Sequence, residues 1–195
     1  MTGVPIELRI ALMRQHGGFP QAYSAAVQAG LEHFGDQNGF LAYKMVHGTA
    51  MVLGDPVAPR QHYERLIQRL RDRHDDLCFC YASRAVAEIL APLGYNINEM
   101  GAENRIDIAT YDFAGRDKRN VRQSLNRMAS LGYTIRESSI SAIGPARIEA
   151  LSQAWKKTRP LRTRETSFIS RPIAFHDEPD VRTIFVQDGD GTLVA

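Results

Sequence analysis

Five basic side chains stand in the first thirteen positions of GRDKRNVRQSLNRMASLGY, residues 115–133, beside a single acid, Asp117. At about 100° per residue, a helix would place four polar side chains within one quadrant: Lys118, Arg119, Arg122 and Asn126. Cationic and amide groups on one face suit contacts with phosphate oxygens. Acids for i,i+4 pairing are almost absent, which favours an anionic partner. A solvated helix face is the alternative.

The neighbouring quadrant of the same helix is apolar and contains Val121, Leu125 and Met128. The sequence therefore predicts an amphipathic helix with a buried apolar stripe beside its cationic stripe. Gly132 is expected to end the helix.

A second segment, residues 155–171, carries six basic groups and one acid. Positive charge gathered in two segments is expected to attract polyanions such as nucleic acids or anionic lipid headgroups. Lys156, Lys157 and Arg164 are the candidates for phosphate contact here. Trp155 is predicted to be a core aromatic at a helix end, and a stacking platform for a base is its alternative role.

Several kinds of chemistry are excluded by the missing motifs. The sequence has no Walker loop, GxGxxG, GxSxG or HExxH, and its six histidines have no metal-binding spacing. The turn Q/R-x-x-G-x-G/A, by which acetyltransferases hold the coenzyme A pyrophosphate, is also absent. We expect neither a metal nor a cofactor.

The two cysteines, Cys78 and Cys80, lie in LCFCYA. A disulfide between residues i and i+2 has poor geometry, so both are predicted to be small buried residues in a reducing compartment. No apolar run approaches the roughly 20 residues needed to cross a bilayer, and no signal peptide is evident. The expected location is the cytoplasm.

Hydrophobic periodicity and turn signals predict intermixed helices and strands. Helices are expected over 5–18, 21–35, 60–74, 83–94, 115–131 and 145–158. Strands are expected over 39–46, 49–53, 77–82, 95–101, 104–113 and 133–139, with a hairpin over 181–195. The turn His47-Gly48 joins the first two strands, and Ser83 and Asp55 are predicted to be cap or turn residues. The fold class is α/β (α+β), a mixed sheet flanked by helices.

The stretch GAENRIDIATYDFAGRDKRNVRQSLNRMASLGYTIRE resembles the C-terminal cytosolic region of the bacterial phosphatidylglycerol lysyltransferases (multiple peptide resistance factors) and their soluble relatives. The matching positions are Gly101, Glu103, Asp107, Phe113, Gly115, Lys118, Arg119, Arg122, Asn126 and Gly132. LGDPVAP at 53–59 and the segment from Trp155 to Arg171 resemble two further motifs of the family. The sequence departs from the pattern at Ala102, where the family often has Glu, and at Asn104.

The resemblance implies a GNAT-like fold in tandem repeats that move an aminoacyl group from aminoacyl-tRNA to phosphatidylglycerol or another hydroxyl acceptor. It implies no acetyl-coenzyme A, in agreement with the missing pyrophosphate turn. We expect a GNAT-like domain over 1–158, a connector over 159–180 and, over 181–195, the opening hairpin of a truncated second repeat. The full-length protein would then be an aminoacyltransferase, and the fragment 1–195 would be inactive alone.

Three charged residues, Glu103, Arg105 and Asp107, alternate along a predicted strand and would share one of its faces. They form either an exposed row of ion pairs or polar groups at the domain interface, facing the acceptor channel. The implied partners are aminoacyl-tRNA and an anionic lipid or other hydroxyl acceptor, with no DNA. Peripheral contact with the inner membrane face is compatible with this reading. The rival function is a non-catalytic module that binds RNA or an anionic membrane surface through the basic segments.

Overall fold

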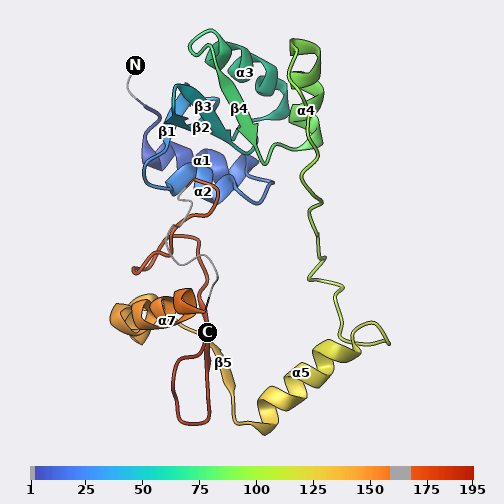
Figure 1. Ribbon diagram of the computed structural model, residues 1–195, viewed down its shortest axis with the longest axis vertical. Coiled ribbons are helices and arrows are strands. Elements are labelled where there is room, and N and C mark those ends of the chain that lie inside the picture. Colours follow the sequence, from blue (N-terminus) through green and yellow to red (C-terminus); the bar gives the residue numbers. More distant parts are fainter. Residues whose placement is uncertain (1–2, 159–167) are drawn as a thin grey trace. The chain divides into compact units, whose positions relative to one another are not determined.

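The computed structural model describes residues 3–158 and 168–195. The described residues form two compact units, 3–100 with 168–171 and 101–158 with 172–195 (Figure 1). Each unit has a core of its own. The predicted division into functional domains at residues 158 and 180 stays a prediction.

The first unit is built on a four-stranded mixed sheet in the order β1-β2-β3-β4. Its strands are β1 (Glu32–Asp36), β2 (Gly39–Val46), β3 (Thr49–Leu53) and β4 (Leu77–Cys80). The first three are antiparallel neighbours, whereas β4 pairs parallel with β3. The predicted turn at His47-Gly48 is confirmed, since both residues have the positive φ that a two-residue hairpin needs (48° and 89°).

Helices cover both faces of this sheet (Figure 1). They are α1 (Ile6–His16), α2 (Ala22–Val27), α3 (Tyr63–Arg71) and α4 (Arg84–Leu90), with short 3-10 turns η1 (Arg60–His62) and η2 (Ala91–Leu93). Along β2, Leu41 packs in the cluster with α3 and α4, and its neighbour Phe40 packs in the cluster with α1 and α2. Alternate side chains of one strand therefore serve two cores. The predicted mixed sheet flanked by helices is confirmed.

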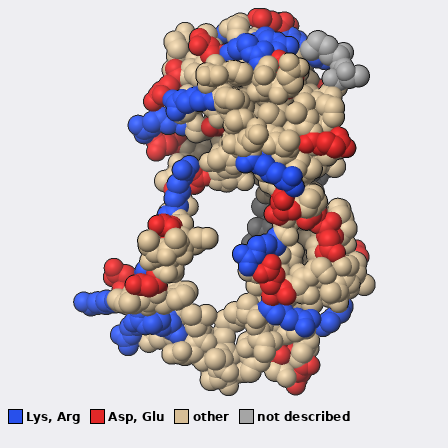
Figure 2. Space-filling model, turned by 180° about the vertical axis from the view of Figure 1, so that it is seen from behind, with Lys and Arg blue, Asp and Glu red and all other residues tan. Residues whose placement is uncertain are grey.

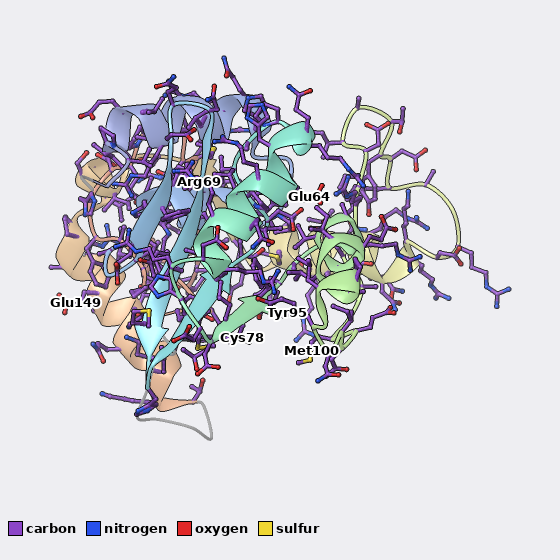
Figure 3. The ribbon with its side chains drawn as sticks, turned by 90° about the horizontal axis from the view of Figure 1, so that it is seen from above. Glu64, Arg69, Cys78, Tyr95, Met100 and Glu149 are labelled. Atoms are coloured by element: carbon purple, nitrogen blue, oxygen red, sulfur yellow. The ribbon has the colours of Figure 1, made fainter. Side chains whose placement is uncertain are left out.

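Helix α3 makes the crossover that a parallel β3–β4 pair requires. All four side chains of its predicted inner face are buried: Tyr63, Leu66, Ile67 and Leu70. Figure 3 looks onto this helix in front of the strands, with Arg69 labelled. Asp36, at the end of β1, accepts hydrogen bonds from Arg65 (2.9 Å) and Arg69 (2.8 Å). The Arg65 hydrogen bond is the main cause of a lowered Asp36 pKa.

A polar contact joins α1, α2 and β1 on the other side. Arg9 Nη1 donates to the carbonyl of Ala26 (2.7 Å) and lies 2.6 Å from His33 Nε2 and 3.0 Å from His33 Nδ1. His33 Nε2 lies 2.9 Å from the carbonyl of Ala25. In its neutral form the ring keeps one nitrogen that can accept from Arg9, whichever tautomer it adopts. Burial, and then the charge of Arg9, lower the pKa of His33 to about 4.

Two sequence predictions in the first hundred residues are corrected. The helix predicted over 21–35 ends at Val27, and β1 begins at Glu32. Gly30, with a φ of 79°, breaks the helix, and Phe34 is buried in the sheet core. No strand forms over 95–101, because no described strand pairs with this segment.

The second unit has a smaller core around a two-stranded antiparallel sheet. Its elements are α5 (Arg119–Ser130), β5 (Thr134–Glu137), α6 (Ile140–Ile143), α7 (Pro145–Lys157) and β6 (Ile184–Gln187). The predicted hairpin after β6 turns at residues 188–191, and its return leg is joined to β6 by the bridge between Gln187 and Leu193 and by backbone hydrogen bonds from Val194 N to the Val186 carbonyl (2.9 Å) and from Val186 N to the Ala195 carbonyl (2.7 Å). The buried side chains are Ile140, Ile143, Ile148, Phe185 and Leu193.

The strand predicted over 104–113 is also absent. Residues in this stretch instead form local turns, in which the Asp107 carboxylate accepts from Ala109 N (3.0 Å) and Thr110 Oγ1 (2.9 Å). An alternating pattern yields a strand only where a neighbour completes the hydrogen-bond ladder, and the described residues supply none here.

Candidate functional site

The loop before α5 is held by two of the predicted phosphate-binding residues. Lys118 Nζ donates to the carbonyl of Asp112 (2.7 Å) and lies 4.2 Å from the centre of the Tyr111 ring. Arg122 Nη1 donates to the carbonyls of Phe113 (2.5 Å) and Gly115 (2.8 Å). Lys118 and Arg122, two members of the predicted cationic stripe, therefore hold the loop 111–115 against the helix.

The other polar residues of α5 remain available to a partner. Arg119, Asn126 and Arg127 are exposed, and Arg119 and Arg127 form no ion pair with a described residue. The helix contains no acid at all. The structure is thus compatible with phosphate contact at Arg119 and Asn126, while Lys118 and Arg122 would have to exchange loop contacts for phosphate. The binding role of all four stays a prediction.

The apolar stripe of α5 is not buried as predicted. Val121 is 41% exposed and Leu125 is 40% exposed, and no residue of the helix belongs to a core. The reason is that no described element of the second unit packs over this face. The helix and its end near Gly132 (φ 76°) are confirmed, but it begins at Arg119 and not at residue 115 as predicted.

The second basic segment is only partly described. Lys156 is half-buried and Lys157 is exposed, both in the last turn of α7. Arg164 lies outside the described residues. Trp155 is 52% exposed, so its predicted place in a core is wrong. On the face shown in Figure 2, Lys and Arg side chains of both units have acidic side chains beside them.

The predicted row of charges at 103–107 is not on a strand. Glu103 and Arg105 form an exposed ion pair (3.2 Å), and Asp107 organises its own turn. An exposed pair of this kind contributes about 0–1 kcal/mol to stability. The role of these residues at a domain interface or channel stays a prediction.

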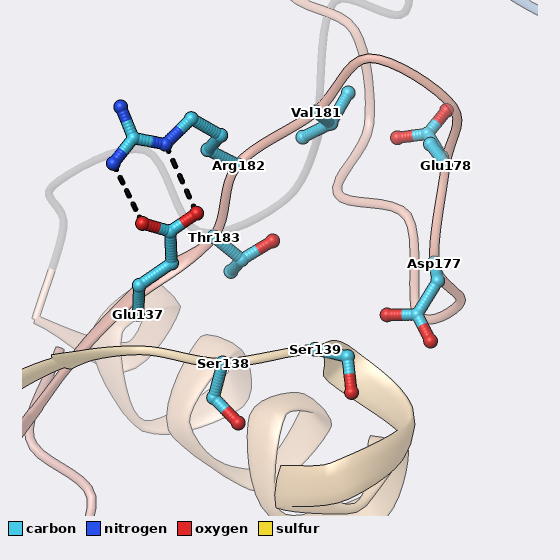
Figure 4. A pocket seen from close by; sticks show the side chains of 8 residues that line it. All are labelled: Glu137, Ser138, Ser139, Asp177, Glu178, Val181, Arg182 and Thr183. Atoms are coloured by element: carbon cyan, nitrogen blue, oxygen red, sulfur yellow. Dashed lines mark hydrogen bonds and ion pairs between the residues drawn. The ribbon is translucent and has the colours of Figure 1, made fainter.

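A polar pocket of about 310 Å³ lies in the second unit (Figure 4). It is lined by Glu137, Ser138, Ser139, Asp177, Glu178, Val181, Arg182 and Thr183. Arg182 makes a two-pronged pair with Glu137 (2.9 and 2.6 Å) across the β5–β6 ends. No sequence motif predicts this pocket, because the residues that line it are far apart in the chain.

Two carboxylates of this pocket, Glu137 and Asp177, have lowered pKa values. The Ser141 hydroxyl is the largest cause of a lowered pKa at Asp177, which also accepts from Ile140 N (2.6 Å). The hydrogen bond from Arg182 lowers the pKa of Glu137. A general base works best with a pKa near the working pH. These two carboxylates are therefore set for holding structure and not for taking protons.

The carboxyl ends of the parallel strands β3 and β4 meet at Asp55. This buried carboxylate accepts a hydrogen bond from Ser83 N (2.7 Å), the residue before α4. The contact joins residues far apart in the chain, so it differs from the local turn or cap role predicted for Asp55. Ser83 occupies the N-cap position, but its side chain makes no cap hydrogen bond. Asp55 thereby connects the end of β3 to the start of α4.

Neither cysteine is placed as a nucleophile. Burial, followed by the neighbouring Cys78, raises the pKa of Cys80 to about 11, so its thiol stays protonated near neutral pH. Cys78 is exposed and Cys80 is half-buried, so the prediction of two buried cysteines is wrong. They lie in β4, whose outer edge is unpaired among the described strands.

Residues 3–158 and 168–195 contain neither a metal-binding cluster of side chains nor a helix able to cross a bilayer. No group of three or more His, Cys, Asp or Glu side chains in these ranges is arranged to hold a metal ion. None of the helices there combines the length and the apolar character that a bilayer crossing requires.

Comparison with known proteins connects this chain to lipid-modifying enzymes. The sequence profile described as "Phosphatidylglycerol lysyltransferase, C-terminal" matches residues 10–195. The bifunctional lysylphosphatidylglycerol biosynthesis protein LysX of Mycobacterium leprae (strain Br4923) is 30% identical over 129 residues, 60% of this chain. The phosphatidylglycerol lysyltransferase of Staphylococcus aureus (strain MRSA252) is 25% identical over 130 residues, 64% of this chain. The matched regions cover only 11% and 16% of those two proteins.

Solved structures share the fold over nearly the whole chain. L-PGS from Bacillus licheniformis superposes with a TM-score of 0.81 at 19% identity, covering 96% of this chain and 58% of that one. The C-terminal domain of a putative lysylphosphatidylglycerol synthetase from Agrobacterium fabrum gives 0.77 at 16% identity, covering 96% and 60%. With the profile matching residues 10–195, the chain belongs to the family of phosphatidylglycerol lysyltransferase C-terminal domains.

Proposed function

We propose that this chain is part of a transferase that moves an aminoacyl group from aminoacyl-tRNA to phosphatidylglycerol or another hydroxyl acceptor. The observation that carries the proposal is the family match over residues 10–195. Relatives in the same comparison are named for the synthesis of lysylphosphatidylglycerol. The fold shared with L-PGS is consistent with it.

The proposed reaction is a transesterification. A hydroxyl oxygen of the acceptor attacks the carbonyl carbon of the aminoacyl ester, and a new ester C–O bond forms. The bond to the tRNA ribose oxygen breaks, and the proton of the attacking hydroxyl ends on that oxygen. The amine of the aminoacyl group is not the nucleophile. Such a reaction needs both substrates held in line and the developing oxyanion stabilised.

The described side chains are better suited to positioning the substrates than to acid–base catalysis. The carboxylates with shifted pKa values, Asp36, Asp112, Glu137 and Asp177, are all shifted downward by hydrogen bonds from cations, hydroxyls or backbone N–H groups. None of them is prepared to remove a proton at neutral pH. The exposed cations of α5 are suited to phosphates of either substrate.

We further propose that residues 1–195 alone transfer nothing. The chain covers 58% and 60% of the two solved relatives. In the second unit, apolar side chains such as Ile108 (89%), Ile135 (55%) and Ile184 (58%) are exposed. A surface of this kind is typical of a unit that needs more polypeptide to complete it.

The test is a transfer assay with charged tRNA and phosphatidylglycerol vesicles. The 195-residue chain alone is expected to leave the lipid unlabelled. A chimera that replaces the matching part of Bacillus licheniformis L-PGS with this chain is expected to label it, and ribonuclease treatment of the tRNA is expected to abolish the label. A chimera that is folded by circular dichroism but transfers from no charged tRNA would contradict the proposal.

The second candidate function is a non-catalytic module that binds RNA or an anionic membrane surface. The observation that favours it is α5, which exposes arginines and apolar side chains together. The same assay separates the two functions, because a binding module would hold tRNA or vesicles in the chimera without labelling lipid.

A further inference from the structure

We propose that residues 111–131, α5 with the loop before it, dock this protein onto an anionic phospholipid bilayer through the exposed apolar stripe of the helix. We call these residues the docking segment. The choice of phosphatidylglycerol as the anionic lipid rests on the proposed function. Beyond that function, the contact with the bilayer is assigned to one element, α5, and to apolar side chains that the sequence predicts to be buried.

The apolar stripe is the first observation. Val121 and Leu125 lie one helical turn apart and are 41% and 40% exposed, and Met128 continues the stripe as a half-buried residue. None of the twelve residues of α5 is buried. An amphipathic helix that finds no protein core can bury such a stripe at the boundary between headgroups and acyl chains.

An exposed aromatic pair extends this stripe. The rings of Tyr111 and Phe113 pack edge to face at 5.5 Å and are 40% and 48% exposed. Lys118 lies over the Tyr111 ring, and Arg122 holds the Phe113 carbonyl. Around the helix axis, Lys118 at the N-cap and Arg122 border the stripe at about 20–120° from its members. The loop contacts therefore hold the aromatic pair next to the stripe, and aromatic rings favour the membrane interface.

Charge is what selects an anionic bilayer as the partner. The docking segment carries five basic and two acidic residues, and one of the acids, Asp112, is paired with Lys118 (3.3 Å). Arg116, in the loop before the helix, is exposed and forms no ion pair with a described residue. Basic side chains around an apolar stripe match anionic headgroups around acyl chains. RNA would use the cations and rings but would leave the aliphatic stripe in water, so a bilayer fits better.

The first test measures binding of the 195-residue chain to vesicles of 30% phosphatidylglycerol in phosphatidylcholine, and of phosphatidylcholine alone. We expect binding to the first only. Replacing the stripe, V121S/L125S, is expected to weaken that binding about tenfold through lost apolar burial. The matched control I173S/V181S, which removes two exposed apolar side chains elsewhere in the second unit (49% and 41% exposed), is expected to change it less than about twofold.

A second test reads the orientation of the helix and leaves Val121 and Met128 of the stripe in place. A polarity-sensitive fluorophore is attached at L125C or Q123C in a C78S/C80S background. These positions lie about 160° apart around the helix. Vesicles with phosphatidylglycerol are expected to shift emission to the blue at position 125 only. Equal emission at the two positions would overturn the proposal.

Other outcomes are equally decisive. Vesicle binding that V121S/L125S leaves unchanged would overturn the proposal, and a loss of tRNA binding in the same variant would assign the stripe to RNA. If vesicle docking fails while the L-PGS chimera still labels lipid, this inference fails and the proposed function stands. If docking holds and the folded chimera labels nothing, the proposed function fails alone.

Discussion

At the scale of single residues, polar side chains in this chain mostly tie elements together. Asp55 connects β3 to α4, Asp36 connects β1 to α3, and His33 connects β1 to the first two helices. His33 is the one whose protonation would break its contacts. A second proton on the ring would remove the acceptor that faces Arg9 and bring two positive charges together.

His33 is therefore expected to make stability depend on pH. Its pKa of about 4 lies below the ordinary 6.5, so the unfolded chain takes up the proton first as the pH falls. Its contribution is full above pH 6.5 and is lost between pH 6.5 and pH 4. We expect the free energy of unfolding in urea to fall by about 1 kcal/mol from pH 7 to pH 5, after discounting for solvent screening of a half-buried ring.

The variant His33→Gln provides the comparison. An amide can donate to Ala25 and accept from Arg9 without titrating, so the fall between pH 7 and pH 5 should shrink in this variant. Asp36 does not interfere, because its pKa is lowered and its carboxyl group titrates below this range. An equal fall in H33Q and the unmodified chain would show that His33 is not responsible.

At the scale of elements, α5 presents different groups on opposite sides. At about 100° per residue, the side chain of Arg119 points about 120–180° away from the members of the apolar stripe. Arg119 could therefore contact tRNA phosphates while the stripe faces a bilayer. Lys118 and Arg122 hold the loop 111–115 and are less available. We thus expect the predicted cationic stripe to divide into two groups. Lys118 and Arg122 hold the loop, and Arg119 and Asn126 are available to a partner.

This division predicts different effects for two substitutions of the same kind. R119Q should reduce the salt dependence of tRNA binding by about 0.7–0.9 in the log–log slope, the value for one phosphate contact. R122Q should change that slope little but speed hydrogen exchange of the amides in 111–115. If R122Q reduced the slope as much as R119Q and left exchange unchanged, Arg122 would be a phosphate contact in solution.

The elements that the sequence predicted well carry local signals. The spacing of Tyr63, Leu66, Ile67 and Leu70 fixes the inner face of α3, and His47-Gly48 fixes a hairpin. The errors arose where tertiary context decides. The alternating residues of 104–113 find no neighbouring strand, and the stripe of α5 finds no core. The pocket around Glu137 and Asp177 was invisible because it joins residues forty positions apart.

At the scale of the whole molecule, the two units differ in how much they bury. The first has two clusters on opposite faces of one sheet, with many side chains fully buried. The second has one cluster of five buried residues. Because each cluster lies within one unit, each unit is expected to unfold as its own cooperative step, and the second with less denaturant.

The single tryptophan makes this prediction easy to test. Trp155 lies in α7, so its fluorescence reports the second unit, whereas far-ultraviolet circular dichroism reports both. In urea, the fluorescence transition should precede the later part of the dichroism transition. Ile148→Ala, in the core of the second unit, should lower only the midpoint of the earlier transition, which fluorescence reports. Leu66→Ala, on the buried face of α3, should lower only the midpoint of the later transition. Each substitution is expected to cost about 2–5 kcal/mol in its own unit. A variant that moved both transitions equally would mean that the described residues unfold as one cooperative body.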